Sequence, residues 1–179
     1  MSITAIILCA LVMLMFSTKA FADETEYSED IVEQIRSFLD DDDWHYDFDE
    51  ERGIFRFGVN LESKLKNVRY FLPVREDGFT VYAVCPINAD KDDPDIIKEM
   101  AEFICRANYG LRNGNFELDV RDGEIRYKIH VDCEDLIPSR EVVRNSIIIP
   151  SAMFDRYAEG ILDIMFRNAT AADAIEKCE

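Results

Sequence analysis

The sequence predicts an α+β protein in which an antiparallel sheet, built from three β-hairpins, is covered by helices on one face. Two observations carry this prediction. Strand-like stretches occur in pairs, each joined by a short turn, and stretches with helical spacing of apolar residues precede, separate and follow these pairs. Apolar and polar residues alternate along the strand-like stretches, which is typical of an antiparallel sheet with one face toward a core.

The hairpins are predicted from their turns. A four-residue turn at 50–53 joins the first pair of strands, and Asp-Gly turns at 77–78 and 122–123 join the second and third, because Asp-Gly tolerates the positive φ angles of two-residue turns. The expected cross-strand neighbours are Phe48–Phe55, Tyr46–Phe57, Trp44–Val59 and Asp47–Arg56; Val74–Val81, Leu72–Ala83 and Tyr70–Cys85; and Val120–Ile125, Leu118–Tyr127, Phe116–Ile129, Asp119–Arg126 and Glu117–Lys128.

The third hairpin, "NFELDVRDGEIRYKIHVD", is rich enough in charge to suggest a metal loop. In the expected register, however, opposite charges lie across from each other on one face and apolar residues meet on the other. The pattern therefore predicts a hairpin, with no metal needed.

Helix boundaries are marked by capping residues. Ser28 precedes a helix that should end in the acidic run 40–43, and Asp93 followed by Pro94 begins the central helix. A short helix is expected before Pro150 and a longer one after it, and Thr170 with Asp173 forms a capping box for a last short helix.

The composition argues against several functions. A formal charge of −17 disfavours a nucleic-acid binder, which needs clustered Lys and Arg. None of the common nucleophile, zinc-protease, phosphate-binding or dinucleotide-binding motifs follows a predicted strand. We therefore expect no enzyme activity, no catalytic residue and no cofactor.

Residues 1–22 differ from the rest, which we expect to form one domain over 23–179. An apolar run from Ile3 to Phe16 is followed by Ala20-Phe21-Ala22, which is the order of a secretory signal peptide, although positive charge before the run is lacking. We expect an extracytoplasmic or secreted protein with no stable membrane span after cleavage. An uncleaved anchor, or a wrongly assigned start of a cytoplasmic protein, is the alternative. Cysteines 85, 105, 133 and 178 could form two disulfides in three connectivities, but they show no close pairs, and we expect free thiols.

One segment partly matches a calcium loop. Residues 88–99 place acids or an amide at positions 1, 3 and 5 and Glu99 at position 12, but Asp93 and Pro94 stand where the loop needs glycine and a continuing turn. Helix capping explains the same residues, so no metal site is predicted.

An apolar island interrupts the polar face of the predicted sheet. Phe71 is expected beside Val84, and Pro73 beside Tyr82, where the other hairpins place charges. Such an island suggests a protein contact, for which Phe71, Tyr82 and Val84 are the candidate residues. A helix or loop of the same chain that covers it is the alternative.

The C-terminal helix is apolar over a wide arc, which suits either a buried core helix or a homodimer interface.

Four stretches in order resemble the YbjN family of bacterial sensory transduction regulators: "DDDWHYDFDEERGIFRFGV", "YAVCPINADKDD", "FICRANYGLRNGNFELDVRDGEIRYKIHVD" and "MFDRYAEGILDIM". The most specific part is Asn-Tyr-Gly leading into Gly114-Asn115-Phe116 and then Asp122-Gly123-Glu124. The resemblance implies a fold like that of type III secretion chaperones, binding of protein segments, a tendency to dimerise and no known active site. The leader departs from the family pattern, since most relatives begin near the first helix and act in the cytoplasm.

These observations predict a non-enzymatic, chaperone-like or regulatory interaction module that binds a protein segment, at an exposed strand edge or at the apolar island. The alternative is an extracytoplasmic sensor of a small ligand or cation that uses the acidic loops.

Overall fold

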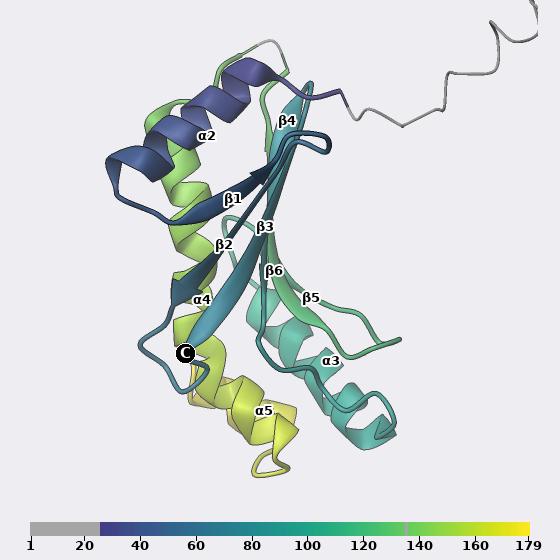
Figure 1. Cartoon of the computed structure of the whole chain (residues 1–179). Helices are drawn as coiled ribbons and strands as arrows, with labels where there is room; N and C mark the ends of the chain where they lie inside the picture. Colours follow the sequence, from purple (N-terminus) through teal and green to yellow (C-terminus); the bar gives the residue numbers. More distant parts are fainter. Residues whose placement is uncertain (1–25, 135) are drawn as a thin grey trace, which may run out of the picture.

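The computed structural model describes residues 26–134 and 136–179, and these form one antiparallel sheet with helices against it (Figure 1). The predicted signal peptide at 1–22 lies outside the described residues. The strands are β1 (Tyr46–Asp49), β2 (Ile54–Asn60), β3 (Asn67–Arg75), β4 (Gly78–Val84), β5 (Asn115–Leu118) and β6 (Ile125–Asp132). The helices are α2 (Glu29–Asp41), α3 (Pro94–Asn108), α4 (Arg140–Met165) and α5 (Ala171–Glu176).

The strand order is β1-β2-β3-β4-β6-β5, with every neighbouring pair antiparallel. The first four strands form a meander. Helix α3 then carries the chain to the far edge, so β6 pairs with β4 on one side and β5 on the other. The predicted fold class and the three hairpins are confirmed.

The first hairpin has the predicted register, with Phe48 opposite Phe55 and Asp47 opposite Arg56. The strand begins at Tyr46, so the expected pairing of Trp44 with Val59 is wrong. Instead, the Trp44 ring packs edge-on against Phe57 at 5.4 Å between ring centroids.

The second hairpin lies two residues from the predicted register: Tyr70 faces Ala83, and the turn is Glu76-Asp77 rather than Asp77-Gly78. Gly78 is needed within the strand, because a Cβ there would come within 2.3 Å of the Val131 carbonyl oxygen. A shift of two residues keeps each side chain on its predicted face.

The third hairpin is also shifted by two, with Phe116 opposite Tyr127 and Glu117 opposite Arg126. Its loop is longer than predicted, because the chain turns over Val120–Gly123, and the exposed Val120 does not pair with Ile125. Gly123 has φ +77° and donates its N–H to the Asp119 carbonyl at 2.7 Å. The longer loop therefore shifts the cross-strand pairing by two residues, but each side chain stays on its predicted face of the sheet.

Helix α4 is one helix of 26 residues, not two, and Pro150 lies inside it. Proline lacks an N–H, so the carbonyl one turn earlier loses its helical partner and nearby carbonyls are displaced. The two carbonyls that follow it accept hydroxyl groups: Tyr70 of β3 donates to the Ile147 carbonyl, and Ser151 donates to the Ile148 carbonyl, each at 2.8 Å. The Tyr70 hydrogen bond thus joins the sheet to the helix next to the proline.

The predicted caps are confirmed. The side chains of Ser28, Asp93 and Thr170 accept backbone N–H groups at the starts of α2, α3 and α5, respectively. Ser139 caps α4 in the same way.

The core lies between the sheet and the helices. Alternate residues of β2, β3, β4 and β6 are buried on one face, where α2 and α4 cross the sheet (Figure 1). Phe116 of β5 packs edge-on against Phe154 and Tyr157 of α4, with ring centroids 5.3 and 5.4 Å apart. The opposite face carries the half-buried and exposed residues of the same strands, together with the buried Val84. Within the described ranges, no helix combines the length and the apolar character needed to cross a membrane.

Candidate interaction surface

The face of the sheet that lies away from the helices, hereafter the open face, carries two rows of side chains that cross the strands. The first row is Asp47, Arg56, Phe71, Tyr82, Lys128 and Asn115. The second row is Gly58, Arg69, Val84, Arg126 and Glu117. In both rows apolar side chains lie at the centre and basic side chains lie next to them.

The structure brings two of the three candidate contact residues together in a new pairing. Phe71 lies directly opposite Tyr82, not Val84, and both aromatic side chains are half-buried. Val84 is only 4% exposed, so it supports the surface but offers almost no area to a partner. The predicted pairing was wrong because the second hairpin turns one residue earlier than expected.

Arg126 covers one side of the aromatic pair. Its guanidinium carbon lies 4.5 Å from the centre of the Tyr82 ring, a cation–π contact. Its Nε also donates to the Glu117 carboxylate at 2.7 Å, and Lys128 lies 3.5 Å from the same carboxylate. These contacts hold Arg126 in place beside Tyr82. The Glu117–Lys128 contact was predicted from the sequence, whereas the Arg126–Glu117 contact follows from the shifted register of the third hairpin. The Arg126–Tyr82 contact could not be predicted because the strand order was unknown.

Arg56 lies on the other side of the aromatic pair, directly opposite Phe71. Its guanidinium lies 3.0 Å from Asp49 and 3.5 Å from Asp47. The hydrogen bond from Arg56 lowers the pKa of Asp49. The Asp47–Arg56 cross-strand pair was predicted from the sequence and is confirmed.

The β5 edge of the sheet is closed by a side chain. The Asn108 amide, at the end of α3, donates to the Phe116 carbonyl at 2.9 Å and accepts the Phe116 N–H at 2.7 Å. It takes the place that a neighbouring strand would occupy, and so blocks pairing at this residue. Asn108 belongs to the most specific motif of the sequence, and this bond pair is a physical reason for an asparagine there.

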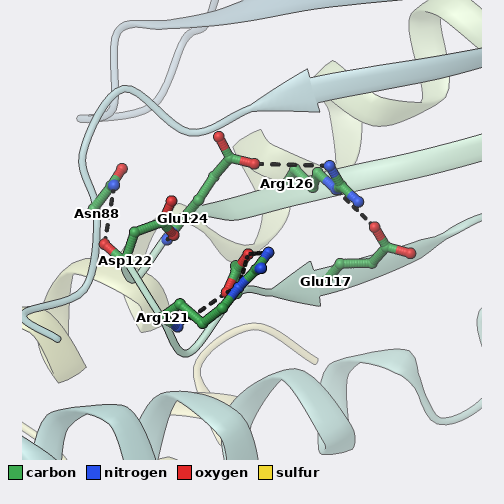
Figure 2. A network of polar contacts seen from close by, with 7 residues as sticks. Asn88, Glu117, Arg121, Asp122, Glu124 and Arg126 are labelled. Atoms are coloured by element: carbon green, nitrogen blue, oxygen red, sulfur yellow. Dashed lines mark hydrogen bonds and ion pairs between the residues drawn. The ribbon is translucent and has the colours of Figure 1, made fainter.

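A polar network surrounds the loop between β5 and β6 (Figure 2). Asp119 binds Arg121 through both carboxylate oxygens, and the Asn88 amide donates to the Asp122 carbonyl at 3.2 Å. The hydrogen bonds from Arg121 lower the pKa of Asp119 to about 2. The predicted Asp119–Arg126 pair is therefore replaced, since Arg126 turns to Glu117.

The segment that partly matches a calcium loop contributes to helix packing. Asp93 caps α3 and forms an ion pair with Arg167, while Glu99 accepts the Ala171 N–H at 2.7 Å. In the part of the chain that the structure describes, no three His, Cys, Asp or Glu side chains are grouped to hold a metal ion.

Two hollows lie away from the aromatic pair. One of about 390 Å³ opens where α3, the end of α4 and the start of α5 meet, beside Asp95, Glu99 and Thr170. Another of about 400 Å³ lies at the β5–β6 loop and reaches Arg126.

Cysteines 85, 133 and 178 are buried, Cys105 is exposed, and all four are free in the structure. Burial raises the pKa of the Cys85 thiol to about 11, which keeps this thiol protonated and unreactive at neutral pH.

A sequence model of one family, described as "Putative bacterial sensory transduction regulator", matches residues 32–163, from α2 to the end of α4. The chain belongs to the YbjN family. No curated protein and no solved structure matches it. The YbjN match includes the open face, the Asn108 edge and the β5–β6 loop. The likeness to type III secretion chaperones stays a prediction.

Proposed function

We propose that this YbjN protein is a non-enzymatic regulatory module that binds a segment of another protein on the open face of its sheet. The observation that carries the proposal is the half-buried Phe71–Tyr82 pair at the centre of a face that no described helix covers. Aromatic side chains held on a rigid strand pair lose little freedom on binding and are frequent centres of protein interfaces.

The open face is a better candidate than the sheet edges. Asn108 occupies the main-chain groups of Phe116 at the β5 edge. The other edge strand, β1, has only four residues, and two of them are aspartates. Short and charged edges disfavour the addition of a strand. We therefore propose that the partner binds through side-chain contacts on the open face and does not add a strand to the sheet.

Site-specific photo-crosslinking in the native cell tests the proposal. A benzophenone amino acid would be placed at position 71 or 82, and in matched controls at Tyr109 and Phe166, which are 91% and 67% exposed aromatic residues outside the open face. We expect a discrete crosslinked partner from positions 71 and 82 and none from the controls. The same crosslinks from Tyr109 or Phe166, or no crosslink from the open face, would contradict the proposal.

The alternative function, an extracytoplasmic sensor of a small ligand or cation, draws no support from these contacts, because Asp93 and Glu99 already serve α3 and α5. A calcium titration followed by thermal melting separates the two functions. A ligand that binds only the native state must raise the melting temperature. We expect no shift at millimolar calcium, and an increase would favour the sensor.

Export and homodimer formation are part of the same proposal. The intact mass of the native protein, measured by cell fraction, tests the leader: a chain that begins at residue 23 in an envelope or secreted fraction supports export, and a full-length cytoplasmic chain contradicts it. Light scattering of the purified protein tests the dimer.

A further inference from the structure

We propose that the segment held on the open face is acidic, with carboxylates on both sides of an apolar side chain. This inference rests on the proposed function above and specifies its partner. The occupant is a segment of another protein, and the argument comes from the charges that surround the aromatic pair.

Basic side chains flank the apolar centre in both rows. In the first row, Arg56 and Lys128 lie on either side of Phe71 and Tyr82. In the second row, Arg69 and Arg126 lie on either side of Val84. A partner side chain that contacts the aromatic pair therefore lies within reach of cations on both sides.

The surroundings of the aromatic pair are less acidic than the molecule as a whole. The two rows hold four basic side chains and two acidic ones, Asp47 and Glu117, whereas the chain has 20 basic and 37 acidic residues. The carboxylates of Asp49 and Glu124 lie 3.0 and 3.8 Å from Arg56 and Arg126, so basic and acidic groups balance here. Net charge alone would favour a basic partner. Salt screens charges beyond about 8 Å at physiological ionic strength, so the side chains at the contact decide which segment binds.

Arg69 is the cation most available to a ligand. Arg56, Arg126 and Lys128 each contact a carboxylate of the protein. Arg69 is exposed and forms no ion pair with a residue of the described ranges. A carboxylate from a partner would give this guanidinium a charge-assisted hydrogen bond without displacing an existing one.

The spacing suits an extended segment that crosses the strands. Arg56 and Lys128 are separated by three inter-strand steps, which is about 14 Å. Residues four apart in an extended chain are separated by about 13 Å, and side chains at positions 1, 3 and 5 point to the same side. The order acid, any, apolar, any, acid therefore places the apolar side chain over the aromatic pair and each acid beside a cation.

An NMR titration of the isotope-labelled protein with short peptides tests this inference. The probes contain glutamate-serine-phenylalanine-serine-glutamate, the same sequence with lysine for glutamate, and the first sequence with serine for phenylalanine. We expect the first probe to shift the amide signals of Phe71 and Tyr82 in a saturable way and more weakly at higher salt. The other two probes should cause much smaller shifts.

A matched pair of variants isolates the role of charge. Arg69→Gln should weaken binding of the glutamate probe about two- to fivefold, the range for one exposed ion pair. Arg144→Gln, an exposed arginine of α4, should leave the affinity unchanged.

Equal binding of the lysine probe, no shift with the glutamate probe, or no effect of Arg69→Gln would overturn the acidic partner. Crosslinks from positions 71 and 82 would still support the proposed function in that case. Displacement of the glutamate probe by a single-stranded oligonucleotide would show selection for any polyanion, and would also overturn the inference.

Discussion

The Asn108 amide allows one structural contact to be tested quantitatively. Asn108→Ala removes both hydrogen bonds to the Phe116 main chain, at 2.7 and 2.9 Å. Each such bond contributes about 0.5–1.5 kcal/mol net. The Asn115 amide also donates to the Phe116 carbonyl, at 3.2 Å, and compensates in part. We therefore expect the free energy of unfolding to fall by about 1–2 kcal/mol in urea denaturation.

Alanine is a better helix former than asparagine, by roughly 0.6 kcal/mol. This gain in helix stability must be separated from the loss of the two hydrogen bonds to Phe116. Asn145→Ala, at an exposed position inside α4, makes the same change without touching a strand edge. Measured against this control, Asn108→Ala should also accelerate hydrogen exchange of the Phe116 amide. Equal stability of the two variants with unchanged exchange at Phe116 would refute the edge-closing role.

Three further predictions concern the sheet and its loops. Tyr70→Phe leaves a buried carbonyl of α4 without its 2.8 Å donor and should lower the unfolding free energy by about 1–3 kcal/mol; an unchanged value in urea denaturation would contradict this. Gly123→Ala should lower the melting temperature, because a Cβ at φ +77° would lie 1.9 Å from the Ala89 carbonyl oxygen, and a wild-type melting curve would show that the loop can shift. The Asp119 carboxyl should titrate at a pKa of about 2 by NMR and return toward 3.8 in Arg121→Gln. Because the folded-state pKa is lowered, the pair stabilises the fold at neutral pH, and this contribution is lost as the pH falls from 3.8 toward about 2.

Local patterns predicted the elements well. Alternation placed the correct residues on each face of β2, β3, β4 and β6, and Ser28, Asp93 and Thr170 marked three helix starts. These signals depend only on residues close in the chain. The same is true of the first hairpin, whose turn and register were predicted correctly.

Two of the errors share one physical cause, a contact distant in sequence that overrides a local preference. Gly78 was assigned to a turn but is required where β4 approaches Val131 of β6. Pro150 was expected to begin a helix but lies within one, supported by the hydroxyl of Tyr70. Neither partner can be identified from neighbouring residues.

The candidate site, too, was determined in part by the sequence and in part by the tertiary structure. The sequence alone determined that apolar residues interrupt the polar face, and it named Phe71 and Tyr82. Only the tertiary structure decided that these two lie opposite each other, that Val84 is buried, and that basic side chains flank them in both rows. Periodicity assigns a side chain to a face of the sheet, but strand order and register set its neighbours, and those follow from packing across the whole chain.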